Sequence, residues 1–139
     1  MSEFVLDDDL MTLRALEGCS PALLQDLFQR VARHLLTQKA KARLLQGGCR
    51  YLDDAGRRCA VGCLIRPGEY DASIEGYDSD SDAVHRVLER SGVPVAHRAV
   101  RDLLGVLRRL HDHAEVEDWP YFLGRVATLN GFEMPCPKN

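Results

Sequence analysis

The chain has 139 residues, of which 45% are apolar, and this is enough for one domain with a single buried core. Its formal net charge of -3 argues against a protein that binds nucleic acid without regard to sequence, because such proteins need a basic face. No run approaches the roughly 20 apolar residues of a membrane span, and the N-terminus lacks the pattern of a secretory signal. We therefore expect a cytoplasmic protein that does not bind membranes. It should form one domain over residues 1–139, with flexible tails at 1–8 and 133–139.

Apolar residues spaced three and four apart predict helices over most of the chain. Ser20 and Pro21 are typical of a helix start, and Gly92 and Gly131 of helix ends. The predicted helices lie at 10–17, 21–39, 82–91, 94–113 and 119–130. The helix at 94–113 has four arginines on its outer side: Arg98, Arg101, Arg108 and Arg109.

The stretch 47–70 departs from this helical pattern. Cys49 to Leu52 predict a short strand, Asp53 to Gly56 a turn, and Arg57 to Val61 a returning strand. Two strands alone form a marginal sheet, so the hairpin has to pack against the helices to persist. The predicted fold class is therefore α+β: a mostly helical single domain of four to five helices with one β-hairpin packed on them.

Residues 49–70 carry the pattern C-x-Y-x4-G-x2-CAVGCLI-x-P-x-E-Y. This pattern resembles a motif in small uncharacterised proteins of bacteria and their phages. Those proteins are also similar in having a long helix before the motif and an HD-then-WP stretch near the end, here His111-Asp112 and Trp119-Pro120. The resemblance covers about residues 20–131. It implies a shared fold and a small accessory role, and it assigns no activity to individual residues.

The sequence holds five cysteines, an odd number in a chain without a signal peptide, so we expect reduced thiols. Cys59 follows two arginines, and nearby cations lower the pKa of a thiol, which makes Cys59 a candidate nucleophile. The base would be one of four downstream histidines: His85, His97, His111 or His113. Cysteine is also among the most buried residue types, and we favour a packed thiol over a catalytic one.

A zinc site is a second candidate, with Cys49, Cys59 and Cys63 as thiolate ligands and one imidazole. Cys59 and Cys63 would share a face if their segment were helical. The stretch has neither a Cys-x2-Cys knuckle nor a histidine at a conventional spacing. We therefore favour unligated thiols and predict no cofactor.

Arginines and tyrosines cluster around the predicted hairpin, and these residue types are enriched at interaction hot spots. The predicted binding residues are Arg50, Tyr51, Arg57, Arg58, Arg66 and Tyr70. The favoured function is a non-enzymatic interaction protein of bacterial or phage type that binds a protein or ribonucleoprotein complex. Such a protein would inhibit a larger host assembly, for example one used in defence. A homodimer built on the apolar helix stripes is compatible with this hypothesis.

Two alternatives come from other classes of function. The first is a cysteine-dependent hydrolase or transferase that uses Cys59 and a downstream histidine. The second is a protein that sequesters a small ligand or nucleotide through the arginines around the hairpin. Overall the residues favour a protein that is not an enzyme.

Overall fold

The computed structural model describes residues 6–13, 19–42 and 50–135. Within these ranges the α-helices are α1 (Asp8–Met11), α2 (Pro21–Gln38), α3 (Asp82–Arg90), α4 (Arg98–His113) and α5 (Trp119–Asn130). Short 3-10 turns lie between them: η1 (Gly62–Leu64), η2 (Pro67–Glu69), η3 (Ala72–Ile74) and η4 (Val116–Asp118). None of the helices in the described ranges is long and apolar enough to cross a membrane.

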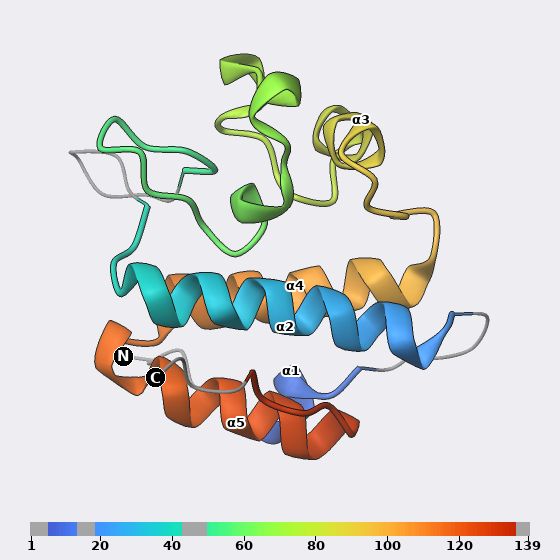
Figure 1. The fold of residues 1–139 in the computed structure, drawn as a ribbon, viewed down its shortest axis with the longest axis vertical. Helices are drawn as coiled ribbons and strands as arrows, with labels where there is room; N and C mark the ends of the chain where they lie inside the picture. The colour runs from blue at the N-terminus through green and yellow to red at the C-terminus, as the bar shows by residue number, and fades with distance from the viewer. Residues whose placement is uncertain (1–5, 14–18, 43–49, 136–139) are drawn as a thin grey trace, which may run out of the picture.

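The core lies between α2, α4 and α5, which pack against one another in pairs. Figure 1 shows α2 and α4 running along the middle of the molecule, with α5 and α1 on one side and the segment 50–95 on the other. Each long helix contributes fully buried side chains to this core, among them Phe28 of α2, Leu103 of α4 and Leu123 of α5. The layer formed by 50–95 therefore rests on a helical base.

The helices predicted at 21–39 and 119–130 are confirmed, and each ends at a residue with positive φ, Lys39 (53°) and Gly131 (74°). The helix predicted from Pro94 begins later, at Arg98. A turn occupies the residues between, because the N–H of His97 donates to the carbonyl of Pro94. Of the helix predicted at 10–17, α1 covers only the start, and residues 14–18 lie outside the described ranges.

Both ends of the described chain contact the helices. Arg125 of α5 donates to the Asp8 carboxylate at 2.8 Å. Near the other end, the N–H of Glu133 donates to the side chain of Gln25 at 2.8 Å. Residues 1–5 and 136–139 lie outside the described ranges.

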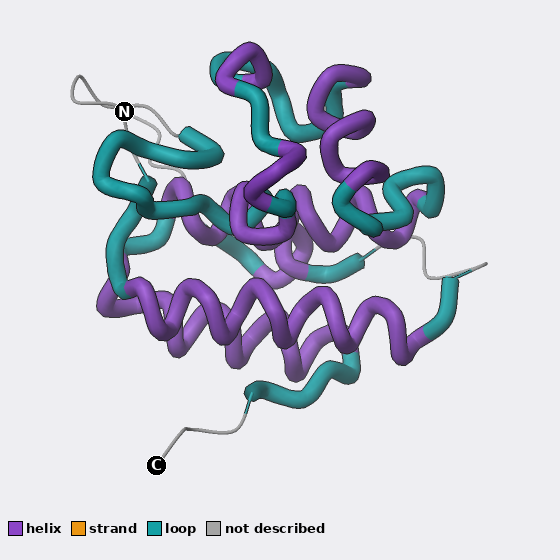
Figure 2. Tube along the Cα trace, turned by 45° about the horizontal axis from the view of Figure 1, so that its top comes forward, coloured by secondary structure: helices purple, strands orange, loops and turns teal. Residues whose placement is uncertain are grey.

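The predicted β-hairpin, and with it the α+β class, is wrong. The described residues contain no strand, and Figure 2 shows the segment from residue 50 to α3 as loops and short helical turns. A single antiparallel bridge joins Leu52 and Arg58. The flanking hydrogen bonds run from Asp53 N–H to the Arg57 carbonyl (2.9 Å) and from Cys59 N–H to the Tyr51 carbonyl (3.4 Å).

Side chains satisfy the outward backbone groups that a sheet would have paired. The Glu75 carboxylate accepts the N–H of Tyr51 at 3.0 Å and of Leu52 at 3.1 Å. Across the bridge, the Gln38 amide accepts the Arg58 N–H at 2.9 Å and donates to the Arg58 carbonyl at 2.8 Å. A backbone N–H or carbonyl group needs a hydrogen-bond partner, and a side chain can serve as that partner. These side-chain contacts therefore take the place of neighbouring strands on both edges of the bridge. After Cys59 the chain then bends into η1.

His34 of α2 adds a further bond to the same carbonyl. Its Nε2 lies 2.9 Å from the oxygen of Arg58, and since a carbonyl can only accept, Nε2 carries the proton. Burial lowers the pKa of His34, which keeps the ring neutral at pH 7. The Arg58 backbone is thus held by two residues one turn apart on α2.

Replacing Gly124 by alanine is expected to stabilise the protein by about 0.5–1 kcal/mol. Gly124 lies inside α5, and a Cβ added there would have no heavy atom within 4 Å. Alanine therefore keeps the helix and removes conformational freedom from the unfolded chain. Urea unfolding at pH 7 measures the change. A destabilised variant would mean that space is lacking beside α5.

Candidate functional site

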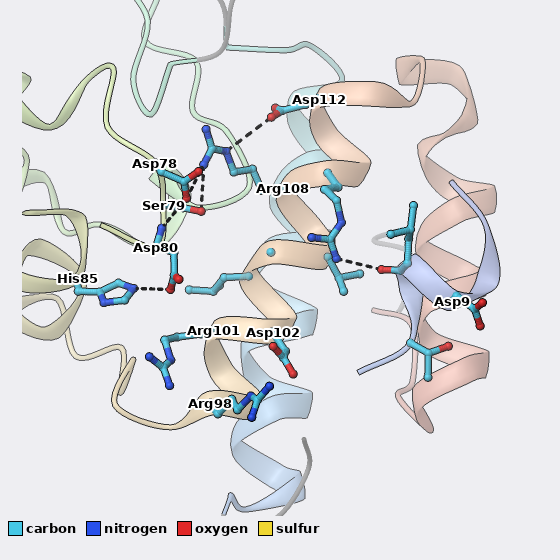
Figure 3. A pocket seen from close by; sticks show the side chains of 16 residues that line it. Asp9, Asp78, Ser79, Asp80, His85, Arg98, Arg101, Asp102, Arg108 and Asp112 are labelled. Atoms are coloured by element: carbon cyan, nitrogen blue, oxygen red, sulfur yellow. Dashed lines mark hydrogen bonds and ion pairs between the residues drawn. The ribbon is translucent and has the colours of Figure 1, made fainter. Parts of the chain in front are cut away.

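A cleft of about 730 Å³ runs along the outer face of α4. Figure 3 shows α4 as its floor, with the loop 78–80 and His85 on one side and α1 on the other. The long-range packing of these elements brings together charged residues that are far apart in the sequence. Its ionisable lining residues are Asp9, Asp78, Asp80, His85, Arg98, Arg101, Asp102, Arg108, Arg109 and Asp112.

Several charged side chains of the cleft are bound within the protein. Arg108 donates to the Ser79 hydroxyl at 3.1 Å and lies 3.6 Å from the carboxylates of Asp78 and of Asp112. Arg109 donates to the carbonyl of Leu10 at 3.1 Å, which ties α4 to α1. On the opposite wall, Asp80 lies 3.2 Å from the His85 ring. These contacts fix the walls of the cleft.

Arg98 and Arg101 differ from these residues. Both are exposed, and neither forms an ion pair or hydrogen bond with another side chain in the described part of the chain. They lie three residues apart at the start of α4, on the side of the helix that lines the cleft (Figure 3). Beside them, the Oδ2 atom of Asp102 is buried and lacks a hydrogen-bond partner among the described residues.

The position of these two arginines is unfavourable for the helix itself. The N-terminal end of a helix carries a partial positive charge, so cations there destabilise it by about 0.3–1 kcal/mol each. The first turn of α4 contains no acidic residue. Folding stability therefore does not explain Arg98 and Arg101, whereas a bound anion would be attracted both by their guanidinium groups and by the helix.

A second hollow of about 370 Å³ adjoins the cleft. The two share three lining residues, Asp78, Arg108 and Asp112. Tyr51 and Cys59 also line the hollow, and both are nearly fully buried, at 4% and 3% exposure. The guanidinium of Arg108 lies over the Tyr51 ring, 6.0 Å from its centre.

Three of the predicted binding residues gather around Glu75. Its carboxylate accepts the hydroxyl of Tyr70 at 2.7 Å as well as the backbone N–H of Tyr51. The Nε atom of Arg50 lies 3.8 Å from the same carboxylate, and its Nη1 binds Asp54 at 3.0 Å. Arg50, Tyr51 and Tyr70 are thus used largely within the protein, around a carboxylate that sequence analysis did not select.

The other three predicted binding residues lie apart from this group. Arg57 is half-exposed and binds the buried carboxylate of Asp53 at 2.7 Å. Arg58 is partly buried and donates to the carbonyl of Ile65 at 2.9 Å. Arg66 is exposed and forms no ion pair in the described ranges. The six residues therefore do not form one continuous free surface.

The candidate nucleophile Cys59 is buried against the backbone of η1. Its sulfur accepts the N–H of Gly62 at 3.2 Å, yet burial outweighs this contact and raises the thiol pKa to about 11. Burial also raises the pKa of Cys63. Within the described ranges, hydrogen bonds join Cys59 to none of the four candidate bases: His85, His97, His111 and His113.

Of those histidines, His111 lies deepest. It is fully buried, its Nδ1 lies 2.8 Å from the Asp112 carboxylate, and its ring stacks on Trp119. His97 and His113 are exposed at the two ends of α4. The predicted catalytic pair is therefore not assembled as a hydrogen-bonded unit in this structure.

Native Cys59 is expected to resist alkylation. With a pKa of about 11, about one thiol in a thousand is ionised at pH 8, and the thiolate is the reactive form. Iodoacetamide at pH 8, followed by peptide mass spectrometry, should label Cys59 only after denaturation. If Cys59 in the folded protein were labelled faster than the partly exposed Cys19, the thiol would not be buried, and the result would support the nucleophile hypothesis.

The metal hypothesis receives no geometric support from the described ranges. No group of three or more histidine, cysteine, aspartate or glutamate side chains there could hold a metal ion. Cys59 and Cys63 lie within the described ranges, and both are free thiols. Cys49, the third predicted ligand, lies outside the described ranges.

Comparisons of the chain with protein-family models, with curated proteins and with solved structures return no match.

Proposed function

We propose that the protein is a non-enzymatic interaction protein that holds one anionic group of a larger protein or ribonucleoprotein partner in the cleft beside α4. The observation that carries this proposal is the pair Arg98 and Arg101. They are exposed, lie one turn apart and have no ion-pair partner in the described part of the chain, while Arg108 and Arg109 are bound internally.

Guanidinium groups suit this role because each offers a planar fork of N–H donors that matches a carboxylate or a phosphate. The rest of the cleft restricts what can enter. Five carboxylates line it, those of Asp9, Asp78, Asp80, Asp102 and Asp112. A long polyanion would be repelled along most of this length, so the arrangement favours a single anionic group placed at the start of α4.

The compartment and the kind of partner in this proposal are those expected from the sequence. The protein acts in the cytoplasm, and its partner is a host assembly that it inhibits; the resemblance of residues 49–70 to small phage and bacterial proteins supports this part. The alternative of a cysteine-dependent hydrolase is weaker, because Cys59 is buried and its raised pKa keeps it protonated. An interaction protein requires no such ionised nucleophile.

Capture of a partner from an extract of the native host tests the proposal. The baits are the wild-type protein, the double variant Arg98→Glu/Arg101→Glu, and the control Arg33→Glu. Arg33 is exposed on α2, outside the cleft, and forms no ion pair in the described ranges. One partner should be retained by the wild type and by the control, and lost from the double variant.

The variants also separate binding from folding. Glutamate near the start of α4 interacts favourably with the helix dipole, and this offsets repulsion from Asp102. The double variant should therefore unfold within about 0.5 kcal/mol of the wild type. Capture of the same partner by all three baits would contradict the proposal, because the partner would then bind elsewhere.

A further inference from the structure

Tyr77 stands out at the edge of the second hollow. Its side chain is 56% exposed, whereas of the other large apolar side chains in the described ranges only Tyr121 is comparably exposed. The backbone of Tyr77 is nevertheless fixed: its carbonyl accepts the Tyr51 hydroxyl at 2.6 Å, and its N–H donates to the carbonyl of Ile74 at 3.1 Å. An exposed aromatic side chain thus projects from a fixed backbone at the rim of a hollow, without being buried in the core.

The walls of the hollow carry two arginines whose hydrogen-bond donors the protein uses only in part. The Nε atom of Arg50 is buried 3.8 Å from the Glu75 carboxylate, and its Nη1 atom donates one hydrogen bond, to Asp54 at 3.0 Å. The Arg108 guanidinium forms one hydrogen bond, to Ser79, and its two carboxylate neighbours lie at 3.6 Å, beyond hydrogen-bond distance. A guanidinium group has five N–H donors, so both arginines retain donors for a ligand.

Acceptors line the same hollow and balance its charge. The Asp78 side chain is 74% exposed, and Asp112 is partly buried beside Arg108. The hollow is lined by two arginines and two aspartates, so the net charge of its lining is near zero. A free phosphate would approach both carboxylates, and an aliphatic group would leave the arginine donors without partners. The lining instead matches a neutral planar group that has both donors and acceptors on its edge.

From these observations we infer that the hollow binds a single nucleobase, stacked on the Tyr77 ring, with its edge facing Arg50 and Arg108. Unstacked bases are recognised in this way, by an aromatic or guanidinium plane together with hydrogen bonds to the base edge. A volume of about 370 Å³ is at the lower end of the range of ligand sites, which suits a nucleoside. The base belongs either to a free nucleoside or to an unpaired position of an RNA strand.

This base site is independent of the anionic group proposed at Arg98 and Arg101, and either can fail alone. The test is titration of the 15N-labelled protein with adenosine, guanosine, cytidine and uridine, which carry no phosphate. At least one nucleoside should give saturable amide shifts centred on residues 50–52 and 76–78. The double variant Arg98→Glu/Arg101→Glu should bind that nucleoside as the wild type does.

Variants of Tyr77 make the test specific. Tyr77→Ala should weaken binding about tenfold or more, because it removes the stacking ring. Tyr77→Phe keeps the ring and should bind within about threefold of the wild type. The side chain is exposed, so both variants should retain the wild-type spectrum away from the hollow. Absence of saturable shifts with all four nucleosides, or equal affinity of Tyr77→Ala and the wild type, would overturn the inference.

A single-stranded tetranucleotide of the preferred base identifies the source of the base. The site is assigned to an RNA strand if the tetranucleotide binds more than tenfold tighter than the nucleoside and if Arg98→Glu/Arg101→Glu loses this extra affinity. Equal affinities assign it to the free nucleoside. Either result supports the base site itself, provided that Tyr77→Ala weakens the binding of both ligands.

Discussion

Gly62→Ala is expected to lower the free energy of unfolding by about 3 kcal/mol or more, a large share of the roughly 5–15 kcal/mol that stabilises a typical domain. An added Cβ would collide with the carbonyl oxygen of Tyr51, and it would lie 2.7 Å from the carbon of the same carbonyl. The obstacle is backbone and cannot rotate away. The same carbonyl accepts the N–H of Cys59, so a shift there also disturbs the bridge between Leu52 and Arg58.

The control for this prediction is Gly68→Ala. Gly68 lies in η2, and an added Cβ there would have no heavy atom within 4 Å. Its unfolding free energy should stay within about 0.5 kcal/mol of the wild type. If chemical denaturation gave equal midpoints for both variants, the close approach of η1 to Tyr51 would be incorrect.

Glu75→Gln should cost about 2 kcal/mol or more, although the substitution hardly changes size. The carboxylate accepts the N–H groups of Tyr51 and Leu52 on different oxygens, and the Tyr70 hydroxyl as well. A glutamine amide has one acceptor oxygen, so its NH₂ group must face one of the two backbone donors. That N–H then loses its partner at a site where the Glu75 side chain is only 15% exposed.

The control is Glu89→Gln, which also removes one negative charge but lies outside the hydrogen-bond network of Glu75. Glu89 is exposed on α3 and has no ion-pair partner in the described ranges. Its unfolding free energy should remain within about 0.5 kcal/mol of the wild type. Urea unfolding of both glutamine variants at pH 7 measures the difference. A Glu75→Gln protein as stable as Glu89→Gln would show that the carboxylate does not hold the segment 50–52.

The long helices could be predicted because the information for them is local. In α2 the apolar stripe through Leu24, Leu27, Phe28 and Val31 repeats at helical spacing, and all four side chains are buried. The start of α4 was misplaced because proline is equally compatible with a helix start and with a turn. The hydrogen bond from the His97 N–H to the Pro94 carbonyl distinguishes a turn from a helix start, and this bond is visible only in the folded chain.

The segment 50–61 could not be predicted in the same way. Its alternation of residues fits a hairpin, but its outward peptide groups bind Gln38 and Glu75, which lie outside the segment. Side-chain partners at that separation leave no periodic signal. The pattern therefore indicated correctly that 53–56 reverses the chain, and indicated wrongly that the flanking residues form strands.

The candidate site, too, could be predicted only in part from local sequence. Sequence analysis placed Arg98, Arg101, Arg108 and Arg109 on the outer side of one helix. Which of them is available depends on where the loop 78–80 and α1 come to lie, because those elements bind Arg108 and Arg109. The one local signal was the presence of two cations, with no acidic residue, at the start of α4.

We propose that Arg98 and Arg101 form the binding site and do not stabilise the fold. This claim is tested most directly by measuring both the affinity for the purified partner and the melting temperature of three proteins: wild type, Arg98→Glu/Arg101→Glu and Arg33→Glu. We predict about a hundredfold weaker binding for the double variant only, with melting temperatures that agree within a few degrees. A double variant that binds within threefold of the wild type, or one that loses binding because it unfolds, would contradict the claim.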